Sequence, residues 1–176
     1  MNAPMRVVLD GHDGAGKSTI AEALSAKRSL RYIKPFHGSL GDFVAWAWQT
    51  ERYELADAAA RGALEFALSA VEPKTSVVFD RHWLTMFTVL PESLWPSWTN
   101  KPRTILCWTD PITTSVRLRD RGEEPGSLAH HELYCERYLS LARRFEVPVV
   151  DTTHLSVPEA IDQIESILQD ISGLNR

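Results

Sequence analysis

The sequence predicts one α/β domain in which a five-stranded parallel sheet lies between two layers of helices. Two observations support this prediction. Short apolar runs alternate with amphipathic helical patterns along the chain, which is typical of consecutive βαβ units. A glycine-rich motif also stands directly between the first apolar run and the first helical pattern. The 176 residues, of which 44% are hydrophobic, suffice for one domain with a substantial core.

The expected strands and helices follow from the period of the apolar residues. Strands are expected at residues 5–9, 29–33, 75–79, 103–108 and 147–150. Helices are expected at residues 19–27, 38–50, 53–71, 83–89, 111–119, 128–145 and 157–171, and a proline-rich loop at 91–102. Parallel sheets bind ligands at the carboxyl ends of their strands, where this chain repeatedly carries polar residues. These are Asp10, the pair Asp80-Arg81, and the pair Thr109-Asp110.

Residues 11–18 read GHDGAGKS and match the phosphate-loop pattern G-x-x-x-x-G-K-[ST]. The glycines allow backbone N–H groups to face a phosphate, and the helix that follows adds the positive end of its dipole. We expect Lys17 to reach the outer phosphates of a nucleoside triphosphate and Ser18 to hold Mg²⁺. The residues expected to bind the triphosphate are Gly11, Asp13, Gly14, Ala15, Gly16, Lys17, Ser18 and Thr19.

Asp80, Arg81 and His82 directly follow the third predicted strand. At the ligand-binding edge, Asp80 can hold Mg²⁺ through water or accept a proton, and the planar guanidinium of Arg81 can bind phosphate. The alternative is a salt bridge that only terminates the strand. The phosphate loop on the neighbouring strand favours a functional role for Asp80 and Arg81.

Three arginines, Arg117, Arg119 and Arg121, occur within residues 117–124. A solvated helix end would explain them. However, an enzyme that transfers phosphate has to place cations around the moving phosphoryl group and exclude water. We therefore predict a flexible lid at about residues 117–128, with Gly122 and Gly126 as hinges.

Composition and charge argue against several classes of function. The net charge of −4 and the pI near 5.9 argue against a surface that coats nucleic acid, although not against a local basic pocket. Cys107 and Cys135 have no metal-like spacing and are expected to be buried thiols. No signal-peptide pattern opens the chain and no apolar run is of membrane-spanning length. We therefore expect no membrane partner and a cytoplasmic location.

Three motifs, taken in order, resemble those of thymidylate kinases and, more widely, of nucleoside-monophosphate and deoxynucleoside kinases. They are Gly-x-Asp-Gly-Ala-Gly-Lys-Ser-Thr at 11–19, Asp-Arg after the third strand, and Arg-x-x-x-Arg-Gly-Glu at 117–123. The resemblance covers about residues 6–150. It implies the three-layer P-loop kinase fold over the whole chain, ATP and Mg²⁺ as cofactors, and transfer of the ATP γ-phosphate to a deoxynucleoside monophosphate.

The resemblance also implies roles for individual residues. Ser18 and Asp80 would hold the metal, Asp13 would lie near the sugar hydroxyl of the acceptor, and Arg81 would reach across both phosphate groups. Trp46 and Trp83 are candidates for stacking on the base, although plain packing explains any single tryptophan. The expected catalytic residues are Lys17, Arg81, Asp80, Arg117, Arg121 and Asp13, and the expected acceptor-binding residues are Arg61, Asp13, Phe43, Trp46 and His37.

The chain departs from this family on the acceptor side. Lys34-Pro35 stands where the family has Arg-Glu-Pro, and Asp57 replaces an aromatic residue one turn before Arg61. Two alternatives to a nucleotide acceptor therefore stay open. One is a kinase of a hydroxyl group on a deoxynucleoside or modified pyrimidine, including one within DNA. The other is a non-catalytic nucleotide switch. The base of the acceptor and the oligomeric state, including a homodimer, also stay open.

Overall fold

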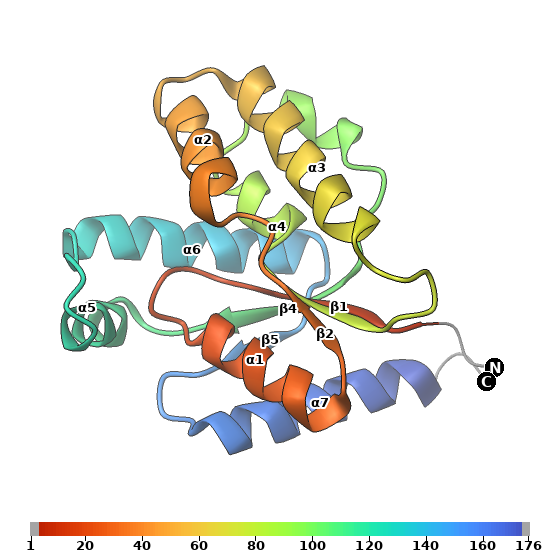
Figure 1. Cartoon of the computed structure of the whole chain (residues 1–176). Helices are drawn as coiled ribbons and strands as arrows, with labels where there is room; N and C mark the ends of the chain where they lie inside the picture. Colours follow the sequence, from red (N-terminus) through yellow and green to blue (C-terminus); the bar gives the residue numbers. More distant parts are fainter. Residues whose placement is uncertain (1–3, 174–176) are drawn as a thin grey trace.

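Five parallel strands form one sheet in the order β2-β3-β1-β4-β5 (Figure 1). The computed structural model describes residues 4–173. Central strand β1 pairs with β3 and β4, and Val7, Val8 and Leu9 within it are fully buried. Such continuous burial follows because helices cover both faces of a parallel sheet. The predicted sheet is therefore confirmed. The strands are β1 (Arg6–Asp10), β2 (Arg31–Ile33), β3 (Val77–Asp80), β4 (Arg103–Trp108) and β5 (Val149–Asp151).

Helices lie on both faces of the sheet and complete a three-layer architecture, with α1 and α7 on one face (Figure 1). On the other face lie α4 and α6, and the antiparallel pair α2 and α3 packs beyond α4 (Figure 1). In the described part of the chain, no helix is both long and apolar enough to cross a membrane. The helices are α1 (Lys17–Arg28), α2 (Gly38–Gln49), α3 (Tyr53–Ser69), α4 (Trp83–Phe87), α5 (Pro111–Asp120), α6 (Leu128–Arg144) and α7 (Val157–Gly173).

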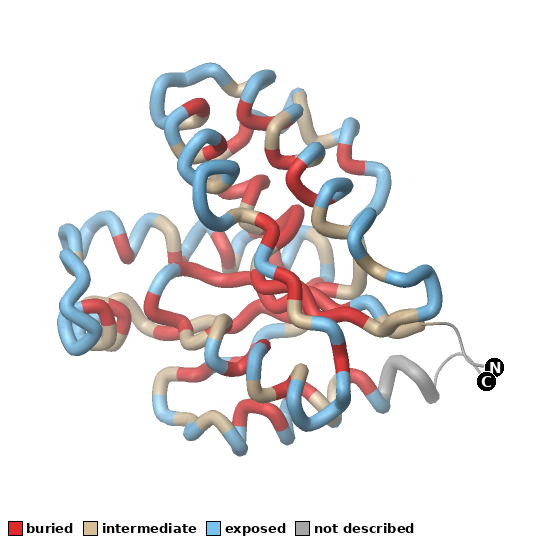
Figure 2. Tube along the Cα trace, in the orientation of Figure 1, coloured by how far each residue is buried: buried red, intermediate tan, exposed pale blue. Residues whose placement is uncertain are grey.

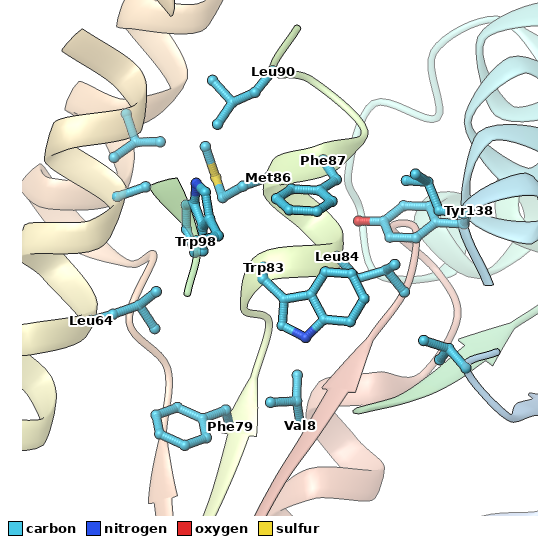
Figure 3. Close-up of a cluster of buried hydrophobic side chains, with 14 of the residues drawn as sticks. Val8, Leu64, Phe79, Trp83, Leu84, Met86, Phe87, Leu90, Trp98 and Tyr138 are labelled. Atoms are coloured by element: carbon cyan, nitrogen blue, oxygen red, sulfur yellow. The ribbon is translucent and has the colours of Figure 1, made fainter. Parts of the chain in front are cut away.

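Two apolar clusters, one on each face of the sheet, form the core, and buried segments follow the sheet and the inner sides of the helices (Figure 2). Figure 3 shows the larger cluster, in which Trp83 packs among side chains from β1, β3 and α4. The indole N–H of Trp83 donates to Thr104 Oγ1 at 2.8 Å. This expected stacking residue is therefore a core residue. Cys107 and Cys135 are buried free thiols, as predicted.

The ends of the elements differ from the prediction where local capping decides them. Ser29 adopts a left-handed conformation with φ 52°, which ends α1. Consequently β2 begins at Arg31, two residues later than expected. Gly16 precedes α1 and also has a left-handed conformation, so α1 begins earlier, at Lys17. The proline-rich segment contains a short 3₁₀ helix, η1 (Glu92–Ser97).

A buried carboxylate joins α3 to η1. Asp57 is only 3% exposed, and its Oδ1 accepts a hydrogen bond from the indole N–H of Trp98 at 2.7 Å. Its Oδ2 accepts from Arg61 Nε and a terminal guanidinium nitrogen at 3.0 and 2.8 Å. The hydroxyl of Ser97 adds a bond at 3.2 Å. Asp57 therefore has a structural role where the sequence suggested only the loss of an aromatic residue.

We expect Asp57→Ala to lower the free energy of unfolding by about 2–4 kcal/mol, since it leaves the buried Trp98 N–H and the Arg61 charge without their acceptor. Asp57→Asn is the matched control because its amide oxygen can still accept from Trp98. Urea unfolding followed by circular dichroism measures both. Equal destabilisation by Ala and Asn would contradict the assigned role of the hydrogen bond.

Candidate active site

The phosphate loop joins β1 to α1 and has two points at which the backbone requires or strongly favours glycine. A Cβ on Gly11 would lie 2.1 Å from the carbonyl oxygen of Cys107. Gly14 has a φ of +77°, in the left-handed region. Gly16 gives no side-chain cap to α1, so the first N–H groups of this helix stay available to an anion. The loop therefore has the features of a phosphate-binding site.

Lys17 is the first residue of α1 and is only 5% exposed. Its ammonium donates to the carbonyl oxygen of His12 at 3.2 Å and lies 3.7 Å from Asp13 Oδ1. Burial, together with the nearby charge of Arg81, lowers the pKa of Lys17 to about 8. A cation whose charged form is disfavoured by burial gains from an anionic ligand, which is the role expected of this residue.

Asp80 ends β3 and is fully buried. Its Oδ2 accepts from the Tyr32 hydroxyl at 2.9 Å and lies 3.6 Å from Lys34 Nζ, while Oδ1 has no partner in the described structure. Burial would raise the pKa of Asp80, but the charge of Lys17 and the hydrogen bond from Tyr32 act against it, and the pKa is lowered. The carboxylate is therefore ionised at neutral pH.

The residues around Asp80 fit a magnesium site shared with a nucleotide. The Ser18 hydroxyl and the unpartnered Asp80 Oδ1 are hard oxygen donors, which Mg²⁺ prefers. Within residues 4–173, no three His, Cys, Asp or Glu side chains lie together as a metal site. Mg²⁺ is commonly bound by one or two protein ligands together with water and substrate phosphates. Ser18 and Asp80 can supply the protein part of such a site.

Arg81 has a left-handed backbone with φ 77°, a conformation that costs energy for a residue with a side chain. Its guanidinium donates to the carbonyl oxygen of Gly11 at 3.1 Å and to the Tyr138 hydroxyl at 3.3 Å, and it forms an ion pair with Asp13. The buried Asp10 accepts hydrogen bonds from backbone N–H groups in the turn that directly follows Arg81. Arg81 is thus held against the phosphate loop.

Asp10 was identified in the sequence only as a polar strand end, and the structure gives it a clear task. Its Oδ1 accepts from the N–H groups of His82 at 3.1 Å and Thr85 at 3.3 Å, and from the Thr85 hydroxyl. It therefore ties the start of α4 to the end of β1. Burial raises the pKa of Asp10, against these hydrogen bonds.

A small polar cavity of about 160 Å³ lies over the phosphate loop. Four cations converge on it, of which Lys34 was not expected as a site residue. Arg121 lies at its outer side in an exposed ion pair with Glu123 at 3.0 Å. The lining residues are Asp13, Gly14, Gly16, Lys17, Ser18, Thr19, Lys34, Arg81, Arg121 and Glu123. This cavity brings together most of the residues expected at the ATP phosphates.

Arg117 and Arg119 do not line this phosphate cavity. Arg117 lies in α5 and donates to the carbonyl oxygens of Gly14 at 3.1 Å and Thr152 at 2.6 Å. It borders a second cavity of about 310 Å³, beside Thr19, Leu155 and Val157. Arg119 is exposed. The loop between α5 and α6 covers residues 121–127, which is shorter than the expected lid.

A third cavity, of about 270 Å³, opens beside Asp13 and Arg81. Its walls come from the phosphate loop, α2, α4 and α6. The aromatic side chains that line it come from three different segments of the chain, and the sequence did not identify them as site residues. The lining residues are His12, Asp13, Phe36, Gly41, Val44, Ala45, Trp48, Arg81, Thr85, Met86, Thr88, Val89, His130, Tyr134 and Tyr138.

The expected acceptor residues of the α2 region lie outside this cavity. Phe43 and Trp46 are 41% and 42% exposed, and Arg52 lies over the Trp46 ring at 4.8 Å. His37 precedes α2, and its ring donates to the Lys34 carbonyl oxygen. Trp48 lines the cavity in their place. The cavity therefore borders the expected helix, on a different face from the one that carries Phe43 and Trp46.

Arg61 also lies apart from the phosphate loop. It borders a separate cavity of about 190 Å³, together with His82, Trp98 and residues of α3. Its ion pair with Asp57 fixes it toward η1. The structure therefore does not bring Arg61 together with Asp13 and Arg81, although the family resemblance places all three around one acceptor.

Comparison with known proteins supports the fold assignment. No family model and no curated protein matches the chain. Among solved structures, deoxyadenosine kinase from M. mycoides with dCMP and dCDP bound is similar, with a TM-score of 0.63, 18% identity, and coverage of 95% of this chain and 100% of that chain. The YorR protein from Bacillus subtilis, in complex with phosphorylated GDP, has a TM-score of 0.63 and 18% identity, with coverage of 94% and 96%.

Thymidylate kinase from Candida albicans is also similar, with a TM-score of 0.67, 13% identity, and coverage of 97% of this chain and 93% of that chain. These structures share the three-layer arrangement and nearly the whole length of the chain. The chain therefore has the fold of P-loop nucleoside and nucleotide kinases.

Proposed function

We propose that this protein transfers the γ-phosphate of ATP to the phosphate of a deoxynucleoside monophosphate. The observation that carries the proposal is the position of Arg81. It lines both the polar cavity over the phosphate loop and the aromatic cavity beside it. A monophosphate held by Arg81 would therefore face the ATP phosphates with its phosphate and the aromatic cavity with its base.

The charges near Arg81 support a phosphate acceptor over a hydroxyl acceptor. A hydroxyl acceptor needs a general base of suitable pKa. Asp13 is the carboxylate nearest the acceptor cavity and forms an ion pair with Arg81. Although burial acts to raise the pKa of Asp13, Arg81 and Lys17 hold it well below its ordinary value. A phosphate acceptor needs cations instead, and Lys34 and Arg81 line the phosphate cavity.

The reaction follows from these positions as an in-line attack. An oxygen of the acceptor phosphate attacks the γ-phosphorus, and the bond from that phosphorus to the bridging oxygen of ADP breaks. Lys17, Arg81 and Arg121 spread positive charge around the transferred group. Ser18 and Asp80 would hold Mg²⁺, which would supply further positive charge beside the triphosphate. The cavity beside Arg117, Leu155 and Val157 is apolar enough to take the base of ATP.

The proposal is tested by measuring ADP formation against a panel of deoxynucleosides, deoxynucleoside monophosphates and a hydroxymethyl-pyrimidine DNA duplex. Turnover with a monophosphate, abolished in Lys17→Ala, is the expected result. Transfer to nucleosides or DNA alone would replace the proposal with a hydroxyl kinase. ATP binding without transfer to any acceptor would leave a nucleotide switch.

Trp48→Ala is expected to raise the KM for the acceptor about 5- to 150-fold, because stacking of a base on an aromatic ring contributes about 1–3 kcal/mol. Trp46→Ala, on the same helix but outside the cavity, is the matched control and is expected to leave this KM within about twofold. Steady-state kinetics at saturating ATP measures both. A larger effect of Trp46→Ala than of Trp48→Ala would indicate that the acceptor binds at the face of α2 that carries Trp46, as the sequence suggested.

The affinity for ATP is expected to be constant from neutral pH to about pH 8 and to fall about tenfold per pH unit above it. The reason is that burial lowers the pKa of Lys17 to about 8. Above this pH the free protein holds a neutral amine, which has to take up a proton when the phosphates bind. Calorimetric titration across this range measures the effect. Lys17→Met is expected to bind weakly without this pH dependence, and an unchanged slope in that variant would assign the titration to another group.

A further inference from the structure

Two buried histidines connect the phosphate loop to the start of α6. His12 is the second residue of the phosphate loop and is 8% exposed, and His131 lies in the first turn of α6 and is 2% exposed. His12 Nε2 and His131 Nδ1 are 2.8 Å apart, within hydrogen-bond distance. The His12 ring also stacks on Tyr134, with ring centres 5.5 Å apart and an angle of 8° between the planes.

Both ends of this pair are attached to the site. At one end, His131 Nε2 contacts the carbonyl oxygen of Pro125, in the loop 121–127 that carries Arg121. At the other end, the carbonyl oxygen of His12 accepts from Lys17 Nζ at 3.2 Å and from the N–H of Ala15 at 3.3 Å. Three hydrogen bonds therefore connect the Arg121 loop to Lys17: Pro125 to His131, His131 to the His12 ring, and the His12 carbonyl oxygen to Lys17. His12 itself joins the last two.

The partners determine where the protons lie. A carbonyl oxygen can only accept, so His131 Nε2 carries the proton given to Pro125. The bond between the rings then has two forms: His12 Nε2 donates where His131 Nδ1 carries no proton, and it accepts where His131 Nδ1 carries one. Either form needs both side chains and keeps the contact with Pro125.

We propose that His12 and His131 are positioning residues that hold the Arg121 loop in register with Lys17 for phosphoryl transfer. This role rests on the proposed kinase function, although the hydrogen-bonded pair itself does not. Arg121 and Lys17 approach the same cavity from different segments, and positioning and charge placement dominate catalysis of this type of reaction. An Arg121 loop without its attachment would sample positions away from the γ-phosphate. Loss of the pair therefore lowers kcat more than it raises the KM for the acceptor.

The first test needs neither a variant nor a substrate. Long-range ¹H–¹⁵N correlation spectra distinguish the two neutral tautomers of a histidine. The expected result at neutral pH is a neutral ring for His12 and a proton on Nε2 of His131, with each signal assigned by its loss in a variant. A neutral Nδ1–H tautomer at His131 would overturn the series of hydrogen bonds, whatever the enzyme does, because Nε2 could then not donate to Pro125.

The second test is a double-mutant cycle. His12→Phe keeps a ring against Tyr134 but removes the bond between the rings, and His131→Leu removes that bond and the contact with Pro125. Each is expected to lower kcat about tenfold, and the double variant no further, since both break one series of hydrogen bonds. Additive losses would overturn the shared role. His154→Phe is the matched control, because His154 is exposed and lines none of the cavities described.

The rate of trypsin cleavage reports on the loop 121–127 without depending on kinase activity. Arg119 lies just before the loop and Arg121 lies in it, and both are exposed. Both single variants are expected to be cut there several-fold faster than the wild type, and His154→Phe at the wild-type rate. Unchanged cleavage would overturn the attachment. If the wild type phosphorylates no acceptor while the tautomers and cleavage rates are as expected, the proposed function fails and the paired histidines remain.

Discussion

The site depends on a buried arrangement of charges at the carboxyl ends of β1 and β3. Asp10 ends the central strand and binds the backbone that follows Arg81, while Arg81 binds the carbonyl oxygen of Gly11, directly after Asp10. Asp10 at the end of β1 thus binds the segment after β3, and Arg81 after β3 binds the segment after β1. Because buried charges are costly unless they are paired and hydrogen-bonded, these contacts fix the left-handed backbone of Arg81. Its guanidinium is thereby held between the two cavities.

This arrangement also explains why the triphosphate side could be predicted from the sequence. The phosphate loop binds mainly through backbone groups, and its glycines are required by close approaches such as that of Gly11 to Cys107. Such requirements are local, so a short contiguous motif reports them. Asp80 lies far from this motif in the sequence, but it ends β3, which pairs with β1, and so it comes close to Lys17 and Ser18. The strand that precedes each of them fixes its position at the sheet edge.

The acceptor side could not be predicted in the same way, because its walls depend on how helices pack against one another. In α2, Val44 and Ala47 are buried, and this orientation turns Trp48 toward the cavity and Trp46 toward solvent. The helical spacing of Gly41, Val44, Ala45 and Trp48 was visible in the sequence, but a tryptophan-rich helix offers more than one apolar face. Asp57 accounts for the position of Arg61 in a similar way. It is bonded to Trp98 and also to Arg61, and so it directs Arg61 toward η1.

Arg117, predicted from a charge motif, makes its hydrogen bonds within the protein, and its part in catalysis stays a prediction. Its guanidinium is occupied by the carbonyl oxygens of Gly14 and Thr152, so it joins α5 to the phosphate loop and to the segment after β5. A residue that satisfies several carbonyl groups is not free to follow a moving phosphoryl group. Within residues 4–173, Arg121, one helical turn later, forms its ion pair only with the exposed Glu123. Such surface pairs are weak, which leaves Arg121 as the cation of the loop that can turn toward the phosphates.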